Sequence, residues 1–326
     1  MNEHFIRNIE IKNFKCFENF KAEGFGRVNL IGGKNNVGKT AFMEACLFNL
    51  SSENSLLKNF VKALISIQVS RNYSWLYDLS NSNNTTYMKY IISFLSNYKN
   101  SEINTNLHHL AIKFKQNVQI TLNKENFDND DFEPIFTETE IPLSYNFITS
   151  MHIGSEQLIH LYDQIKLLRK REFINKFINK FDSDLIEYEI IDNMPVCFSK
   201  KINSFVNLDE YGNGLKRYIA YVCAIWANQD GNIYIDEIEN GIHYTNLDKL
   251  WEVILKTSKE ANVQVFATTH SKECIESYAR VAKKLNDKEI GFIELGRNKK
   301  NELDSVVMDS EMFQRFVKLG NEVRGW

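Results

Sequence analysis

The sequence has 326 residues, enough for one large domain or for a core domain that carries a subdomain. Hydrophobic residues make up 43% and charged residues 25%, which excludes collagen-like, coiled-coil and wholly disordered classes. The net charge of -3 lacks the strong basicity of a dedicated nucleic-acid binder. No apolar run approaches about 18 residues, and the first ten residues lack a signal-peptide pattern, so we expect a cytoplasmic protein with no membrane segment.

The first fifty residues have the pattern strand, strand, glycine-rich loop and helix. Ile9 and Ile11 alternate with polar residues, which predicts a half-buried strand over residues 8–12, followed by an aromatic-rich turn over 14–20. A second strand, predicted over 27–31, runs directly into Gly32 and Gly33. The apolar run 41–50 then predicts a buried helix.

Residues 51–145 lose this regularity and are predicted to form a mixed α/β insertion. Two strands within it, 110–114 and 118–122, are expected to pair as a hairpin. Residues 146–182 are predicted to form a helical lobe, because apolar residues recur at helical spacing over 155–182. The insertion also begins with an apolar-faced helical pattern that contains Leu56, Leu57, Phe60, Val61, Leu64 and Ile67.

Strand and helix patterns alternate in the remaining residues, 183–326. Strands are predicted over 185–191, 196–198, 233–235 and 263–267, and helices over 214–227 and 247–256. Such alternation predicts an α/β core, composed of residues 1–50 and 183–326.

Residues 33–40 read GKNNVGKT, a complete phosphate-binding loop that follows a predicted strand and opens a predicted helix. In such a loop the backbone N–H groups face phosphates, Lys39 reaches the β- and γ-phosphates, and the Thr40 hydroxyl binds Mg²⁺. A chance glycine-rich turn would not have this context. We therefore predict ATP and Mg²⁺ as ligands, with a nucleotide site formed by Gly33, Asn35, Asn36, Val37, Gly38, Lys39, Thr40 and Ala41.

Residues 232–237 read NIYIDE, a short apolar strand that ends in two carboxylates. Acidic pairs after strands are often only helix caps or solvated turns, but this pair shares its chain with a phosphate-binding loop. Asp236 is predicted to hold Mg²⁺ through water, beside Thr40, and Glu237 to orient and deprotonate the attacking water.

Two further segments are predicted to contact the nucleotide. The strand at 263–267 leads to His270, which leaves the sheet at the edge where ligands bind in open α/β folds, so we expect it to contact a γ-phosphate or Glu237. Gly212, Asn213 and Gly214 open a predicted helix and would form an anion-binding end, although the same pattern suits a simple glycine-rich cap.

These motifs, in this order, resemble the ABC ATPase superfamily, specifically its RecF and SMC-like branch and the stand-alone ATPases related to the OLD (overcoming lysogenization defect) proteins. The segment IKNFKCF at 11–17 resembles the opening strand and basic turn of that branch, with Lys15 where a basic residue helps to hold the nucleotide. The resemblance covers roughly residues 8–45 and 145–277. Residues 212–214 resemble the signature motif but lack its usual serine, and the Q-loop glutamine is open between Gln157 and Gln164.

The resemblance implies a P-loop ABC ATPase core with an antiparallel β subdomain, a helical lobe and an insertion. It also implies that two subunits enclose two ATP molecules head to tail. OLD nucleases continue into a Toprim domain, whereas this sequence ends at Trp326, so we expect a nuclease or toxin effector to be a separate protein. The expected function is nucleotide-driven dimerisation that regulates this effector in bacterial anti-phage defence.

Two other functions are consistent with the motifs. A RecF-like ATPase in DNA repair would contact DNA phosphates through the basic residues of the helical lobe. A transporter's nucleotide-binding subunit would normally have a complete Ser-Gly-Gly signature, which is absent here. The basic residues in question are Lys166, Arg169, Lys170, Arg171, Lys176 and Lys180.

Overall fold

The structure is a computed structural model. It describes residues 4–48, 100–114, 118–128, 146–150 and 153–320, together with Phe60, Val61, Ala63, Ile67, Leu95, Tyr98 and Asp131. The apolar-faced helix predicted near the start of the insertion therefore lies largely outside the described residues. Among the described helices, none is both long enough and apolar enough to cross a membrane.

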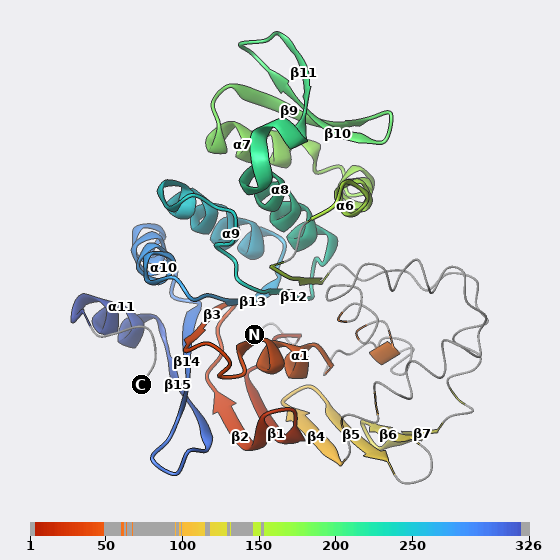
Figure 1. Ribbon diagram of the computed structural model, residues 1–326, viewed down its shortest axis with the longest axis vertical. Coiled ribbons are helices and arrows are strands. Elements are labelled where there is room, and N and C mark those ends of the chain that lie inside the picture. The colour runs from red at the N-terminus through yellow and green to blue at the C-terminus, as the bar shows by residue number, and fades with distance from the viewer. Residues whose placement is uncertain are drawn as a thin grey trace.

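A six-stranded sheet with the order β15-β14-β3-β13-β12-β8 lies at the centre of the molecule (Figure 1). The pairs β14/β3, β3/β13, β13/β12 and β12/β8 are parallel, and only the edge strand β15 is antiparallel to its neighbour. Its strands are β3 (Val28–Gly33), β8 (Phe147–Ile148), β12 (Asn232–Ile235), β13 (Gln264–Thr268), β14 (Ile290–Arg297) and β15 (Leu303–Met308).

The two faces of the central sheet are covered differently. Residues such as Leu30 and Val265 point into a core that they share with helices α8 to α11, whereas Ile31 and Phe266 point into a second core with helix α1. Because both faces are buried, the parallel strands are continuous apolar runs. The helices are α1 (Lys39–Phe48), α8 (Gly212–Ala227), α9 (Leu247–Glu260), α10 (Lys272–Leu285) and α11 (Ser310–Lys318).

A second six-stranded sheet, with the order β2-β1-β4-β5-β6-β7, packs on the other side of α1 and is antiparallel throughout. The hairpin predicted at 110–114 and 118–122 is confirmed as β5 and β6. Strands β4 to β7 lie within the predicted insertion, yet they extend the sheet of the N-terminal hairpin. The strands are β1 (Asn8–Phe14), β2 (Phe17–Glu23), β4 (Ser101–Thr105), β5 (His109–Phe114), β6 (Val118–Leu122) and β7 (Glu125–Phe127).

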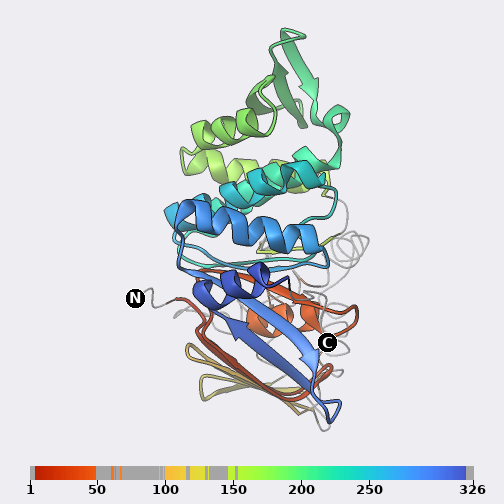
Figure 2. The same ribbon diagram turned by 90° about the vertical axis from the view of Figure 1, so that its left-hand side faces the viewer.

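Helices α6 (Ser155–Leu167) and α7 (Arg171–Phe181) pack beyond α8 and α9, and a three-stranded antiparallel sheet completes that end of the molecule (Figure 2). The sheet has the order β11-β10-β9, and Tyr188 of β9 is fully buried in the same core as Phe177 of α7. Its strands are β9 (Leu185–Ile191), β10 (Met194–Ser199) and β11 (Ser204–Asn207), followed by the 3-10 turn η1 (Leu208–Tyr211).

Two segments differ from the sequence prediction. The helical stretch predicted over 155–182 breaks into two helices, because Arg169, between them, adopts a left-handed conformation with φ 56°. The segment predicted as a turn over 14–20 forms a tight hairpin in which β2 already starts at Phe17, and Phe17 and Phe20 are both buried with their ring centroids 4.8 Å apart. Lys15, with φ 53°, provides the turn.

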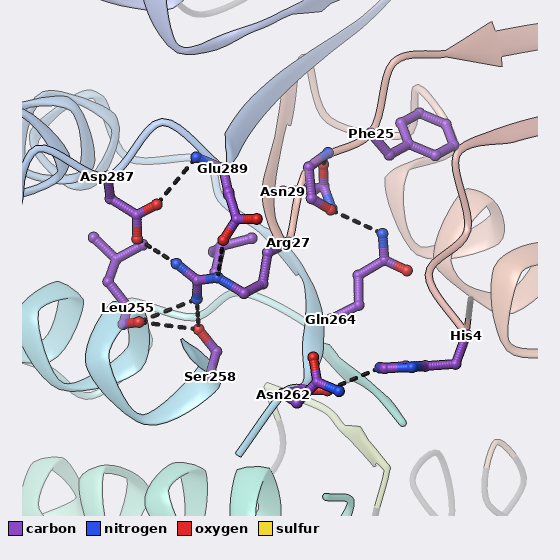
Figure 3. Close-up of polar contacts among 12 residues, drawn as sticks. His4, Phe25, Arg27, Asn29, Leu255, Ser258, Asn262, Gln264, Asp287 and Glu289 are labelled. Atoms are coloured by element: carbon purple, nitrogen blue, oxygen red, sulfur yellow. Dashed lines mark hydrogen bonds and ion pairs between the residues drawn. The ribbon is translucent and has the colours of Figure 1, made fainter. Parts of the chain in front are cut away.

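Polar side chains join the elements at the amino ends of the parallel strands (Figure 3). Arg27, directly before β3, is 2% exposed and donates to the Leu255 carbonyl (3.1 Å), to Ser258, and to the carboxylates of Asp287 and Glu289. A buried guanidinium is tolerated when several of its N–H groups have partners, as here. This network fixes the start of β3 and hence the direction in which its carboxyl end leaves the sheet.

Candidate nucleotide site at the carboxyl edge of the sheet

The loop between β3 and α1 depends on glycine at two positions. A Cβ atom on Gly33 would lie 2.4 Å from the Leu295 carbonyl oxygen, and one on Gly38 would lie 2.6 Å from the Cys16 sulfur. Both glycines have positive φ, 140° and 97°, which L side chains adopt at a cost. The loop therefore presses against β14 on one side and against the hairpin turn of β1 and β2 on the other.

Lys39 is the first residue of α1 and is only 5% exposed. Its ammonium donates to the carbonyls of Gly33 (2.9 Å) and Lys34 (2.8 Å), so the side chain curls back over the loop. Burial lowers the pKa of Lys39 to about 8, and the nearby carboxylates of Asp236 and Glu237 partly oppose this shift. The Lys39 ammonium is thus held against the loop with little access to solvent.

The Thr40 hydroxyl faces the end of β12. It lies 3.1 Å from Oδ2 of Asp236, and Thr268 at the end of β13 donates to the other carboxylate oxygen of Asp236. Hydroxyl and carboxylate oxygens are ligands suited to Mg²⁺, which takes few protein ligands and completes its shell with water and phosphate. Among the described residues no three or more His, Cys, Asp or Glu side chains cluster in a way that could hold a metal ion.

Glu237 follows Asp236 in a left-handed conformation with φ 49°. Its backbone N–H donates to the Thr268 hydroxyl (2.8 Å), which fixes the strained residue against the neighbouring strand. The carboxylate is not enclosed: its side chain is 40% exposed, and it lies 3.7 Å from Nε2 of His270. It is therefore available to a water molecule or a ligand.

His270 stands between the basic and the acidic groups. Its Nδ1 lies 3.3 Å from the Lys39 ammonium, and its Nε2 faces Glu237. The structure thus brings together side chains from three separate segments of the chain, because β3, β12 and β13 are parallel and their carboxyl ends share one edge.

Lys15 lies in the hairpin turn next to the loop. Its ammonium pairs with the carboxylate of Glu44, which is fully buried on α1 one turn beyond Thr40, and it lies 5.9 Å from the centre of the Phe14 ring. The neighbouring Cys16 is the residue against which Gly38 packs. Lys15 therefore joins the turn to α1 beside the phosphate-binding loop.

Residues 212–214 begin helix α8, and Gly212 has φ 78°. A Cβ atom on Gly214 would lie 2.8 Å from the carbonyl oxygen of Gly241, so this end of α8 packs against the segment that follows Glu237. No hydrogen bond or ion pair in the described part of the chain joins residues 212–214 to Lys39, Thr40 or Asp236. The small adjoining cavity, of about 140 Å³, is lined by Ser150, Ile153, Asn213, Lys216, Arg217, Asn240 and Gly241.

Two features of the site did not emerge from the sequence. The short strand β8 ends at the same edge and places Thr149 and Ser150 there. The two candidates for the Q-loop glutamine, Gln157 and Gln164, lie instead on α6. The carbonyl of Ser150 accepts from the Asn240 amide (2.7 Å) and from Arg217. A two-residue strand has no detectable periodicity, so only the apolar pair before Thr149 could have indicated it. The second feature is Glu239, whose carboxylate accepts from the backbone N–H of His270 (2.9 Å).

Comparisons with known proteins agree with this fold. A family model described as "AAA domain, putative AbiEii toxin, Type IV TA system" matches residues 91–276, more than half of the chain. The match begins before β4, so it includes part of the segment that the sequence analysis left outside the resemblance. A Helicobacter pylori protein named ATP/GTP phosphatase is 28% identical in an alignment that covers 83% of this chain and 86% of that protein.

Solved structures of SMC heads have the same fold. The SMC head domain from Thermotoga maritima aligns with a TM-score of 0.52 at 14% identity, over 93% of this chain and 98% of that one. The Smc head domain with an extended coiled coil, bound to the C-terminal domain of ScpA derived from Pyrococcus furiosus, aligns with a TM-score of 0.53 at 12% identity, over 98% and 100%. At these identities the likeness establishes the ABC-type fold of SMC heads and nothing finer.

Proposed function

The chain belongs to the family described as "AAA domain, putative AbiEii toxin, Type IV TA system". On that premise we propose that it binds ATP with Mg²⁺ and hydrolyses it to ADP and phosphate. The observation that carries the proposal is the meeting of Lys39, Thr40, Asp236, Glu237 and His270 at one edge of the sheet, with contacts of 3.1 to 3.7 Å between residues far apart in the sequence. The name of the Helicobacter pylori relative supports the same chemistry.

Each residue has a distinct role in this proposal. The Lys39 ammonium leaves the Gly33 and Lys34 carbonyls and binds the β- and γ-phosphate oxygens, a charge-assisted contact stronger than the one it gives up. Thr40 and Asp236 hold Mg²⁺, which supplies charge neutralisation at the phosphates when bound. A carboxylate oxygen of Glu237 accepts the proton of the attacking water, and His270 orients that carboxylate or the γ-phosphate.

Other residues of the loop and of the turn belong to the same proposal. Asn36, with φ 60°, and the exposed Asn35 shape the loop so that its N–H groups face the phosphates, while Val37 and Ala41 pack beneath it. Lys15 completes the nucleotide end of the site from the hairpin turn.

The direct test is hydrolysis of ATP and of GTP by the purified chain with and without Mg²⁺, compared with Lys39→Ala and with Lys21→Ala. Lys21 is a matched control because it lies on β2 with its side chain 76% exposed. We expect Mg²⁺-dependent phosphate release that Lys39→Ala abolishes and Lys21→Ala preserves. Equal phosphate release by the wild type and Lys39→Ala would overturn the proposal.

The finer part of the proposal concerns partners. We place a second copy of the chain opposite residues 212–214, because Gly212 and Asn213 are exposed and the free N–H groups of a helix start attract anionic phosphate. ATP would then close two subunits head to tail. The resemblance to the OLD-related ATPases supports a separate cytoplasmic effector, a nuclease or toxin in anti-phage defence, which this closure regulates.

The structure weighs against the DNA-repair alternative. Of the six basic residues of the predicted helical lobe, three form ion pairs with carboxylates: Lys166 with Asp163, Arg171 with Glu187 and Glu189, and Lys180 with Glu252. Lys170 lies 4.1 Å from the centre of the Trp226 ring. Basic side chains that already have acidic partners on their own surface release fewer counterions from DNA and bind it more weakly.

A further inference from the structure

We propose that Glu239 is a positioning residue for hydrolysis, which holds the loop that carries His270 against the nucleotide site. The inference rests on the proposed function, because it assigns a role in that reaction. Glu239 lies two residues beyond the candidate general base, in the segment that connects β12 to η2 (Tyr244–Asn246).

The contact is made to the backbone of the loop. Oε1 of Glu239 accepts from the N–H of His270 at 2.9 Å and from the N–H of Ser271 at 3.2 Å. The Ser271 N–H also donates to the Thr269 hydroxyl at 3.0 Å, whereas Glu239 is the acceptor for the His270 N–H. Together these hydrogen bonds fix the direction of the backbone between β13 and α10. They therefore fix the point from which the His270 side chain reaches Lys39 and Glu237.

Capping of α10 alone does not account for this contact. The Ser271 hydroxyl already accepts from the Cys274 N–H at 3.1 Å, which is the ordinary N-cap of that helix. Glu239 instead serves N–H groups at and before the cap, and its other oxygen, Oε2, is buried with no hydrogen-bond partner among the described residues. Burying a carboxylate oxygen without a partner is costly, so a residue chosen for stability alone is not expected here.

The segment that carries Glu239 is itself anchored on both sides. The Ile238 N–H donates to the Thr268 carbonyl (3.0 Å), and Tyr221 of α8 donates to the Ile238 carbonyl (3.3 Å). The Asn240 amide donates to the Ser150 carbonyl at the end of β8. Because α8, β8 and β13 hold this segment in place, its Glu239 also holds the backbone of His270 in place.

The consequence for the reaction follows from the distances. His270 lies 3.3 Å from Lys39 and 3.7 Å from Glu237, so a shift of about 1 Å in its backbone alters both contacts, and misplacement of that size is known to cost large factors in rate. Nucleotide affinity depends mainly on Lys39 and the loop, and the Glu239 carboxylate acts on Lys39 only through its charge, less strongly than Asp236 and Glu237 do. Loss of Glu239 is therefore expected to lower kcat and to leave ATP affinity nearly unchanged.

Three variants separate geometry from charge. Glu239→Gln keeps the length of the side chain and a carbonyl oxygen acceptor, Glu239→Asp keeps the charge but is one methylene shorter, and Glu239→Ala removes both. We expect kcat to fall about 10- to 100-fold in the Ala and Asp variants, as for residues that orient catalytic groups from behind, and Gln to restore most of it. Glu276→Ala, on the exposed side of α10, is the control and should match the wild type.

Hydrogen exchange at the His270 amide, which donates to Glu239, gives a readout independent of turnover. Exchange should be faster in the Ala and Asp variants than in the wild type, and close to wild type in Gln. Wild-type kcat in Ala, or a Gln variant as slow as Asp, would overturn the positioning role; if Ala fails to fold, the Gln and Asp variants decide alone. Absence of hydrolysis in the wild type and in Glu276→Ala would instead refute the proposed function.

Discussion

The amino and carboxyl ends of the parallel strands differ in how their charged side chains are paired and exposed. At the amino ends, Arg27 is 2% exposed and its guanidinium is enclosed by two carboxylates, a hydroxyl and a carbonyl of its own chain. At the carboxyl ends, the Glu237 side chain is 40% exposed and that of His270 is 35% exposed, and the two lie 3.7 Å apart. The first set of charges is satisfied by the protein, whereas the second retains capacity to bind a ligand.

Backbone conformation does not follow this division in charge. Glu237 and Asn36, both at the carboxyl edge, have positive φ values of 49° and 60°, which cost free energy in residues with a side chain. Asp230, Asn262 and Asn286, which lie shortly before β12, β13 and β14 at the amino edge, have similar values of 57°, 55° and 51°. The two edges therefore differ in how their charged side chains are paired and not in the occurrence of left-handed residues.

The largest effect on stability is expected from a substitution at the amino edge. Arg27→Met should lower the free energy of unfolding by about 3–5 kcal/mol, because Asp287, whose side chain is 8% exposed, loses its buried partner. Urea unfolding at pH 7 measures it. A change below about 1 kcal/mol would show that the network does not stabilise the fold.

The matched substitution at the carboxyl edge is Lys39→Met. Burial already depresses the pKa of this lysine, so removing the charge should alter the free energy of unfolding by less than about 1 kcal/mol. ATP affinity, measured by calorimetry, should fall by about 100-fold or more, since the ammonium that compensates the phosphates is gone. A large loss of stability with intact ATP binding would reverse the division between the two edges.

A smaller effect is expected at the start of α8. Gly214→Glu should lower hydrolysis more than nucleotide binding, because a carboxylate there repels the phosphates bound by a partner subunit. Gly214→Ala is the control, since any Cβ meets the Gly241 carbonyl, and the Glu variant should be slower than Ala by roughly tenfold in kcat. Equal kcat in the two variants would make residues 212–214 only a local cap.

The smallest effect concerns an ion pair far from both edges. Glu252 of α9 accepts from Lys256 (2.6 Å) and from Lys180 of α7 (3.1 Å), and these contacts lower its pKa from 4.5 to about 2. Because the folded pKa is depressed, the stabilisation is complete above pH 4.5 and is lost as the pH falls towards 2.

Glu252→Gln should therefore cost about 1 kcal/mol of unfolding free energy at pH 7, the modest value typical of a pair near the surface, and almost nothing at pH 2. Denaturant unfolding at the two pH values measures the difference. Glu276→Gln removes an exposed ion pair on α10 and should leave the free energy of unfolding unchanged at both pH values. A cost for Glu252→Gln that persists at pH 2 would assign the effect to packing rather than to charge.

The sequence made the carboxyl edge recognisable because its chemistry requires particular residues at fixed spacing. Residues 33–40 and 232–237 could be placed on the right strands, and parallel strands bring their ends together. The Arg27 network could not be predicted, since its partners lie about 230 to 260 residues away without any local pattern. The same holds for Glu239, whose hydrogen bonds exist only once β12 and β13 are neighbours.

The insertion illustrates a different limit. The hairpin at 110–122 was predictable from alternation and a turn, but not its pairing with the N-terminal hairpin, because β1 and β4 are about 90 residues apart. The division of the chain into residues 1–50 and 183–326, 51–145 and 146–182 stays a prediction.

Glu237→Gln tests whether the carboxyl edge of the sheet hydrolyses ATP with Glu237 as the general base. Gln keeps the shape of the site but removes the proton acceptor, so ATP binding should survive while turnover falls by about 10²-fold or more. Retained ATP should then hold two subunits together, and light scattering with ATP and Mg²⁺ should report a dimer for Glu237→Gln and a monomer for Lys39→Ala. A slow variant that stays monomeric would keep the base and refute the ATP-enclosing dimer, whereas wild-type hydrolysis by Glu237→Gln would contradict the account.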